Sequence, residues 1–497
     1  MKKLYIILVS LVLSLSALGQ TLRVSLGSVT YLFPAAETGD MNFTNSQTLT
    51  IMGKALALSE ISEMTVDEST VQDNAVSIVY SGTSATVIVS GNVAQYVVPT
   101  INGAHVSIEQ TNTADIDGDE ITYTLTGSTT NGSFSLNGSY KCTIALDGLT
   151  MTNPSGACLN ITNGKRIQIS AKKNTENTLT DGANGTQSGC IYSKGQIQLQ
   201  GNGTLNVAGK TKHAIKSGDY IRIKNITLNI TQAKKDGISC NEYFLMQSGT
   251  VNISGVGDEG IQCELDGTTS TGQTNDHEDE DSGNIYIEGG TLTVKNTKGE
   301  GIESKGELYI TGGEVTVNAK DDAINAASHI TISGGVVYAC ATNNDGIDAN
   351  GNCYIEGGII FAIGARQPEV AIDANTERNF KLYVTGGTII AIGGLERGSS
   401  LTQTCYQSSS WSSNRWYALT VDNQTIAFKT PSSGGSGLVV SGTSTPTLKQ
   451  NVTVSDGTQV FGGNGYTNAT VTGGSNVTLS TYNNNGGGGP GGGPWGW

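Results

Sequence analysis

The stretch "DAINAASHITISGGVVYACATNNDGIDA" at residues 322–349 contains two copies of a short string that encloses a central isoleucine. The string occurs seven times in all, as HAIKS, DGISC, EGIQC, EGIES, DAINA, DGIDA and VAIDA. The spacings between its isoleucines are 23, 23, 41, 22, 23 and 25, and the 41 is one repeat plus an insertion. A fixed period in this range predicts stacked units that bury a core only against their neighbours. These isoleucines are Ile215, Ile238, Ile261, Ile302, Ile324, Ile347 and Ile372.

A second signal repeats in step with the first. It is a strand, a Gly-Gly turn and another strand, as in "NIYIEGGTLTV" (284–294) and "ELYITGGEVTV" (307–317). Each repeat therefore holds about three short strands, and glycine supplies the positive-φ positions of the turns. Because the unit contains only strands and turns, the sequence predicts an all-β fold, a parallel β-helix.

Alternation separates inward from outward side chains along each strand. The central isoleucine points inward, and the small residue two places later shares its side: Ser217, Cys240, Cys263, Ser304, Ala326, Ala349 or Ala374. After the Gly-Gly turn, a run of apolar residues points outward: Val336, Tyr338, Ile359, Phe361 and Ile390. A contiguous apolar patch needs a cover. We expect the 400–480 segment to supply it, with a ligand as the second possibility.

Carboxylates recur at fixed places in the string. Two positions before the isoleucine stand Asp236, Glu259, Glu300, Asp322 and Asp345. One position after it stand Glu303, Asp348 and Asp373, with Gln262 and Asn325 between them. Asp258 and Asp321 add a second acid just ahead. The pattern predicts a file of acids running along the stack.

Such a file has an electrostatic cost. Equivalent residues of adjacent coils lie roughly 4.8 Å apart, and like charges at that distance repel by about 1 kcal/mol per pair even in water. Either some acids stay protonated, or a divalent cation sits between coils, and hard oxygen ligands favour Ca²⁺. The alternative is a hydrated acidic edge that aids solubility and blocks strand misregister. The best candidates for calcium are Asp345/Asp348 and Asp321/Asp322 with Glu300/Glu303, and Asp236, Asp258 and Glu259 are a further set.

The D-G/A-I-x-A string, the GGT turns and the glycine-rich end resemble a family of secreted bacterial carbohydrate-binding proteins. The resemblance covers roughly residues 115–480 and is specific over 210–395. It implies a right-handed, pectate-lyase-like parallel β-helix with calcium between its coils. It also implies binding to plant cell-wall polysaccharide, either polygalacturonate (pectin) or cellulose. The acid pattern is broken at His213 and Val370, so metal is not expected at those two coils.

Composition agrees with this interpretation. The 497 residues include 67 Gly and only 8 Pro, and 14% are charged, a turn-rich all-β profile. The formal charge of −15 excludes a nucleic-acid backbone as partner. It would also repel an acidic glycan unless cations bridge the two. The expected partner is a polysaccharide, acidic or neutral, bound by a monomer.

Targeting features place the protein outside the cytoplasm. Lys2 and Lys3 precede an apolar run from Leu4 to Leu15, which predicts a signal peptide over 1–19 and a secreted, periplasmic or cell-surface location. No other apolar run is long enough to span a membrane. The eight cysteines lack the spacing of a disulfide framework and are interpreted as small buried residues. A Cys240–Cys263 bond across stacked coils is the alternative.

Coarse boundaries follow from where the period begins and ends. We expect a β-rich N-terminal module over 20–105, the carbohydrate-binding β-helix over 115–395, a β cap over 400–480 and a disordered Gly-rich tail over 483–497. The acid-rich insertion between Leu265 and Gly283 is expected to be a solvated loop, with a cation-binding role as the alternative.

Aromatic side chains are the candidates for contact with sugar rings. Tyr286, Tyr309, Tyr354 and Tyr383 share one outward position, broken once by Thr331. Ordinary cross-strand pairing explains such a ladder equally well. No catalytic residues are singled out, because no base pattern recurs among Arg366, Arg378 and Arg397 or the lysines. A non-catalytic binding protein is favoured, with a calcium-dependent polysaccharide lyase or a surface adhesin as the alternatives.

Overall fold

The computed structural model describes residues 19–45, 47–265, 280–295 and 297–483. The predicted signal peptide (except residue 19), the Gly-rich tail from residue 484 and most of the acid-rich insertion lie outside the described residues. Within them the chain is all-β, as predicted, with 3-10 turns only at η1 (Gly91–Val93), η2 (Thr376–Arg378) and η3 (Phe461–Gly463). No helix in this part of the chain is long and apolar enough to cross a membrane.

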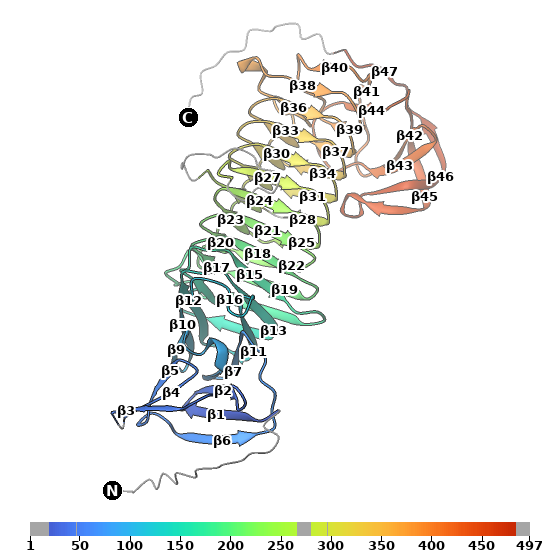
Figure 1. Ribbon diagram of the computed structural model, residues 1–497. Helices are drawn as coiled ribbons and strands as arrows, with labels where there is room; N and C mark the ends of the chain where they lie inside the picture. Colours follow the sequence, from blue (N-terminus) through green and yellow to red (C-terminus); the bar gives the residue numbers. More distant parts are fainter. Residues whose placement is uncertain (1–18, 46, 266–279, 296, 484–497) are drawn as a thin grey trace.

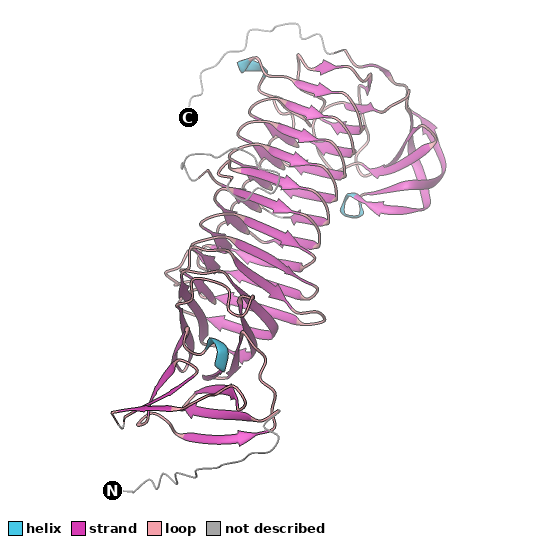
Figure 2. Cartoon of the chain, in the orientation of Figure 1, coloured by secondary structure: helices cyan, strands magenta, loops and turns pink. Residues whose placement is uncertain are grey.

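Short strands stack in three parallel ladders that run the length of the molecule (Figures 1 and 2). The first ladder carries the isoleucine strings and consists of β9 (Val97–Asn102), β10 (Ala104–Gln110), β12 (Gly132–Gly138), β14 (Leu159–Ile161), β17 (Gly189–Ser193), β20 (His213–Ser217), β23 (Ile238–Cys240), β26 (Ile261–Cys263), β29 (Ile302–Ser304), β32 (Ile324–Ala326) and β35 (Ile347–Ala349). Apart from the antiparallel β9–β10 pair, its neighbours are parallel.

The other two ladders flank the Gly-Gly turns. The strands before the turn are β15 (Ile167–Ala171), β18 (Ile197–Gly201), β21 (Ile221–Lys224), β24 (Tyr243–Met246), β27 (Asn284–Ile287), β30 (Leu308–Ile310), β33 (Ile330–Ile332), β36 (Cys353–Ile355), β38 (Leu382–Val384) and β40 (Ser400–Leu401). The strands after it are β16 (Glu176–Asp181), β19 (Thr204–Gly209), β22 (Thr227–Ala233), β25 (Thr250–Ser254), β28 (Thr291–Lys295), β31 (Glu314–Ala319), β34 (Val336–Ala341), β37 (Ile359–Ile363) and β39 (Thr388–Ile392). Glycine is required at the turn because φ there is positive, for example 82° at Gly313.

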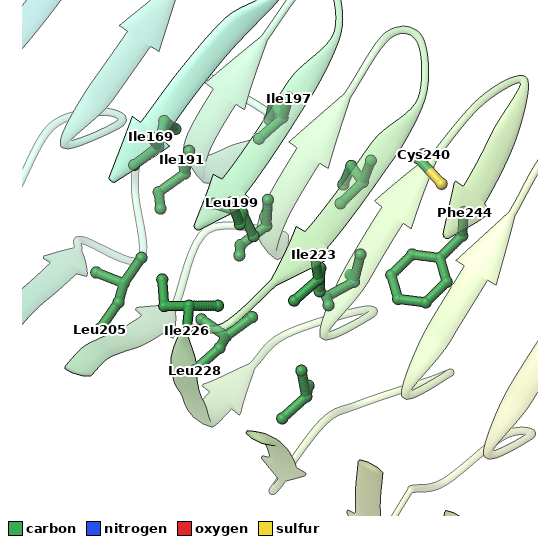
Figure 3. Close-up of a cluster of buried hydrophobic side chains, with 14 of the residues drawn as sticks. Ile169, Ile191, Ile197, Leu199, Leu205, Ile223, Ile226, Leu228, Cys240 and Phe244 are labelled. Atoms are coloured by element: carbon green, nitrogen blue, oxygen red, sulfur yellow. The ribbon is translucent and has the colours of Figure 1, made fainter. Parts of the chain in front are cut away.

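The core lies inside the coils, where the predicted inward residues meet (Figure 3). All seven central isoleucines are fully buried, and the residues of the small slot are buried beside them. All eight cysteines are free thiols, so Cys240 and Cys263 occupy that slot without a bond. Burial of this continuous apolar file, at about 25 cal/mol per Å², is the main stabilisation of the stack.

The N-terminal strands are β1 (Thr21–Leu26), β2 (Val29–Pro34), β3 (Asn42–Thr44), β4 (Thr48–Ile51), β5 (Lys54–Ala57), β6 (Glu63–Asp67), β7 (Ala75–Ser81) and β8 (Ser84–Ser90). Of these, β1, β2, β6, β7 and β8 continue a coil sheet, whereas β3, β4 and β5 form a separate three-stranded sheet. β7 pairs in parallel with β11 (Ile121–Thr129), which pairs in turn with β13 (Cys142–Asn153). The predicted boundary near residue 105 therefore falls inside hydrogen-bonded sheets, and the N-terminal strands cover the first edge of the stack.

The C-terminal segment covers the outward apolar patch, as predicted. Strands β42 (Trp416–Val421), β43 (Gln424–Lys429), β45 (Thr447–Val460) and β46 (Gly465–Asn476) close a small barrel. β41 (Cys405–Ser408), β44 (Leu438–Ser441) and β47 (Ser480–Thr481) join it to the last coils, and β44 pairs antiparallel with β39. One apolar cluster unites Phe361 and Ile390 of the coils with Phe428 and Phe461 of this segment.

Candidate functional site

The predicted acids form two aligned columns along the first ladder. In one column, backbone hydrogen bonds bring Asp236, Glu259, Glu300, Asp322 and Asp345 into register; the Gly301 amide, for example, donates to the Asp322 carbonyl at 2.9 Å. In the other column, strand register aligns Ser239, Gln262, Glu303, Asn325 and Asp348. The isolated bridge between Ile347 and Ile372 extends this column to Asp373. The columns follow from the repeat because equivalent positions of successive strings pair with each other in the ladder.

Three acids converge near the last coils. One carboxylate oxygen each from Asp345, Asp348 and Asp373 lies within 4.8 Å of the other two, so the three could hold a metal ion. We call these residues the downstream trio. Asp345 Oδ1 accepts a hydrogen bond from the Val370 amide, and Asp348 Oδ2 accepts one of 2.8 Å from Asn325 Nδ2. Among the described residues, no Lys, Arg or His side chain forms an ion pair with the trio.

A second group of acids lies earlier in the stack. Asp236, Asp258 and Glu259 satisfy the same distance condition, and we call them the upstream trio. Asp236 is fully buried, and neither of its carboxylate oxygens has a hydrogen bond of normal geometry. Two basic side chains nevertheless contact it, with His213 Nδ1 3.0 Å from Oδ2 and Lys235 Nζ 3.5 Å from Oδ1. Lys235 Nζ also lies 3.5 Å from Asp258 Oδ2. The positive charge of the Lys235 side chain therefore already pairs with the upstream trio.

The acids between the trios are separated by amides and a lysine. Gln262 Nε2 donates to Glu303 Oε2 at 2.8 Å, and Lys305 pairs with the other oxygen of Glu303. Asn344 Nδ2 donates to Asp321 Oδ1 at 2.8 Å, and Asp322 Oδ1 accepts the Asp345 amide. The structure thus leaves Glu300, Glu303, Asp321 and Asp322 outside the two groups with metal-binding geometry. Amide donors reduce the repulsion at Glu303, Asp321 and Asp322, and calcium at these residues stays a prediction.

The pKa values show the strain that remains. Burial, with the charge of Asp348 second, raises the pKa of Asp322 to about 8. Burial likewise raises the pKa of Asp345 to about 7, although the Val370 amide opposes the shift. The pKa of Asp373 is raised by burial and then by Glu396. Without a cation, burial and mutual repulsion therefore disfavour the ionised form of the downstream trio.

The upstream trio behaves differently. Burial raises the pKa of Asp236, but contacts with His213, Glu259 and Lys235 more than offset this, so its pKa is lowered. The pKa of Glu259 is raised, first by burial and then by Asp236. The proximity of the two carboxyls disfavours ionisation of both at once. Lys235 balances part of the negative charge that a metal ion would otherwise have to balance.

The predicted tyrosines are aligned, but neighbouring rings stack on each other. They therefore turn their edges, not their faces, toward the surface. Tyr286 and Tyr309 stack with ring centroids 5.2 Å apart and planes 8° apart, and Tyr354 and Tyr383 stack at 5.1 Å and 11°. Rings that face each other along the stack offer edges and hydroxyls to a ligand on the surface. Tyr286 is also buried, because its hydroxyl donates to Glu280 Oε1 at 2.6 Å. Sugar binding by these tyrosines stays a prediction. Three of their four hydroxyls already have partners within the protein: those of Tyr286 and Tyr309 donate to Glu280 and Glu307, and that of Tyr354 accepts from Asn352 Nδ2.

The end of the insertion differs from a solvated loop. Glu280 and Asp281, the last acids of that segment within the described residues, are 0% and 4% exposed. Asn284 Nδ2 donates to both Glu280 Oε1 and Tyr286 Oη. Glu280 therefore packs onto the start of the tyrosine ladder, and alternation could not show this because the contact is between a loop and a strand.

Comparison with known proteins assigns the family. Residues 102–299 and 282–434 match a family described as carbohydrate-binding domain-containing protein. The chain belongs to this family. A relative from Acetivibrio thermocellus with the same description is 25% identical over 111 residues, which are 20% of this chain and 39% of the relative. The chain thus spans well under half of that relative's length.

One solved structure was also matched. It is titled as the polysaccharide lyase-like protein from C. thermocellum in a gadolinium derivative. It is 19% identical, covers 57% of this chain and 93% of its own, and gives a TM-score of 0.39. Membership of the carbohydrate-binding family supports a glycan as the partner of this chain.

Proposed function

We propose that this chain is an exported, non-catalytic protein that binds acidic plant cell-wall polysaccharide with the help of calcium. The proposal includes a right-handed β-helix as the coil geometry, polygalacturonate as the favoured glycan and cellulose as the neutral alternative. Family membership supports the carbohydrate, and the predicted signal peptide supports export.

The downstream trio is the observation that carries the calcium part. Asp345, Asp348 and Asp373 are close together, poorly exposed to solvent and without a paired cation in the described part of the chain. Carboxylate oxygens in a flexible number are the ligands that calcium prefers. The ion would relieve the repulsion within the trio and, through its open positions, accept a uronate carboxylate of the glycan. That sharing explains how a chain with a net charge of −15 could retain a polyanion.

We place calcium at the downstream trio first. At the upstream trio, Lys235 Nζ occupies the space between the carboxylates that an ion would need. A metal there would have to displace the lysine, and its affinity would be lower. The buried oxygens of Asp236 keep this trio as the second candidate.

Retention on insoluble polygalacturonate tests the proposal. The purified chain is expected to be retained in calcium and released by a chelator. Asp373→Asn, which removes one charge and one ligand, is expected to reduce retention by roughly 10-fold or more, because removal of a charged ligand costs about 1.4 kcal/mol or more. Glu288→Gln removes one charge from an exposed site on the same stack and is expected to have no effect.

Absorbance of unsaturated product is followed in the same samples. A binding protein yields none, whereas turnover would replace the proposal with a calcium-dependent lyase. Equal retention with and without chelator would contradict the role of calcium. Retention by cellulose alone would change the glycan class.

A further inference from the structure

A polar groove runs between the last coils and the C-terminal segment. Three adjoining cavities of about 950, 480 and 490 Å³ make up the groove. The first two share Gln367 and Gly437, and the second and third share Arg366 and Gly434. Their volumes fall in the range of ligand sites, about 300–1,000 Å³. Its lining includes residues of β41 and β44, and β44 pairs with both β41 and β39 (Figure 1).

One wall of the groove contains a glycine, Gly435, at which a side chain has no room. Gly435 donates its amide to the Gly364 carbonyl at 2.9 Å, and its carbonyl accepts Trp411 Nε1 at 3.0 Å. A Cβ on Gly435 would come within 2.5 Å of the Ala365 carbonyl oxygen. The close backbone contact fixes this wall and orients the Trp411 indole, which lines the middle cavity.

The groove also contains two arginines without carboxylate partners. Arg366 lines the second and third cavities and Arg397 lines the first, and both side chains are exposed. Within the described residues, neither makes an ion pair with Asp or Glu. Unpaired guanidinium groups are notable in so acidic a chain, and they suit planar, bidentate recognition of carboxylates. The remaining lining includes several Ser and Gln side chains, which hydrogen-bond neutral hydroxyls, and the acids Glu377 and Glu396 in the first cavity.

The groove adjoins the downstream trio. Val370, which lines the first cavity, donates its amide to Asp345 Oδ1. Glu396, in the same lining, raises the pKa of Asp373, after the larger effect of burial. A ligand in the groove would therefore lie beside the trio, with Arg366 lining the second and third cavities and Arg397 lining the first together with Glu377 and Glu396.

We propose that this groove binds a segment of an anionic polysaccharide. Arg366 and Arg397 pair with carboxylates of successive acidic sugars, and the Trp411 indole stacks on a sugar ring between them. The assignment rests on the proposed function, to which it adds the place and the charge of the glycan. It also explains how an acidic protein attracts a polyanion at positions where no calcium is needed.

Titration calorimetry with polygalacturonate oligomers, on the full chain in calcium, tests the groove. Removing one guanidinium–carboxylate pair is expected to weaken Kd roughly 10-fold, so Arg366→Gln and Arg397→Gln should each do so and the double variant more. Arg415→Gln, an exposed arginine of the barrel outside these cavities, should bind like the parent. Calcium titration should give the same affinity in all these proteins, which shows that the trio is intact.

Fluorescence tests the indole. Oligomer binding is expected to change the emission of the parent and of Trp416→Phe, but not of Trp411→Phe. Unchanged Kd in the double arginine variant would overturn the groove and leave the proposed function standing. No binding of acidic oligomers by the parent would overturn both. Equal binding of uncharged cello-oligosaccharides, insensitive to the arginines, would overturn the anionic assignment.

Discussion

Removing calcium is expected to lower the melting temperature strongly at pH 8 and only slightly at pH 5. The carboxyls of Asp345 and Asp348 in the downstream trio have folded pKa values raised to about 7 and about 6, mainly by burial. An unfolded Asp has a pKa of about 3.9. Below that value both states are protonated and the groups contribute no difference in stability. As the pH rises, the unfolded chain loses protons first, so the stability of the metal-free fold falls until the folded pKa is passed.

The size of the effect follows from the shift. For Asp345 alone, a rise from about 3.9 to about 7 costs the folded state roughly 4 kcal/mol at pH 8. Bound calcium offsets the cost by stabilising the ionised form, and calcium at 100 times its Kd adds about 2.7 kcal/mol per site. Proton release on binding makes calcium affinity rise with pH. Thermal unfolding with calcium or with a chelator, at several pH values, measures both trends.

Asp373→Asn provides the control. It deletes a carboxyl whose pKa is raised by burial, so its metal-free form should be more stable than the metal-free parent at pH 8. Its response to calcium should be weaker. A chelator effect that is absent, or that is equal at pH 5 and pH 8, would contradict the account of the downstream trio.

Phe361→Ala is expected to destabilise the protein by about 3–5 kcal/mol, the usual cost of truncating a buried phenylalanine. Phe361 is fully buried and packs with ring centroids 5.3 Å from Tyr338, 5.3 Å from Phe428 and 5.5 Å from Phe461. This ring packing attaches the barrel to the coil face. Its removal should release the C-terminal segment before the stack unfolds, because the core inside the coils is a separate cluster.

Limited proteolysis and chemical denaturation measure the two parts of this prediction. Cleavage should begin between residues 408 and 480 in Phe361→Ala while the coils stay protected. Phe43→Ala, at a side chain that is 58% exposed, should change stability by no more than about 0.5 kcal/mol. A single cooperative transition with the parent's midpoint in Phe361→Ala would show that the cap does not depend on this packing.

The repeat made most of the coil stack predictable. Ile324 and Ile347 enter the same ladder position because their strings are 23 residues apart, and alternation then places Ala326 and Ala349 inside. The same reasoning aligned the acids in columns. It could not show that Lys235 occupies the upstream trio, since a side chain's direction beyond Cβ is not set by period. The lysines of "KKD" at 234–236, directly before Asp236, are the sequence signal that could have indicated it.

The groove was beyond sequence reasoning for a different reason. Trp411 and Arg366 lie 45 residues apart outside the period, and they meet only because β44 pairs with the last coil strand. Non-local pairing of this kind leaves no local pattern. Similarly, Glu280 is buried by a loop contact rather than by strand register. The repeat predicts which residues lie in the stack, whereas the contacts made by the insertion and the cap become visible only in the structure.

Calcium titration of the chelated chain by calorimetry tests the central claim most directly. At pH 7.5 the account predicts saturable binding with proton release, and Asp348→Asn with Asp373→Asn should abolish the tightest site while Glu288→Gln leaves it unchanged. Binding heat that is absent in the parent, or that is identical in the double variant, would contradict the claim that these stacked acids hold a cation.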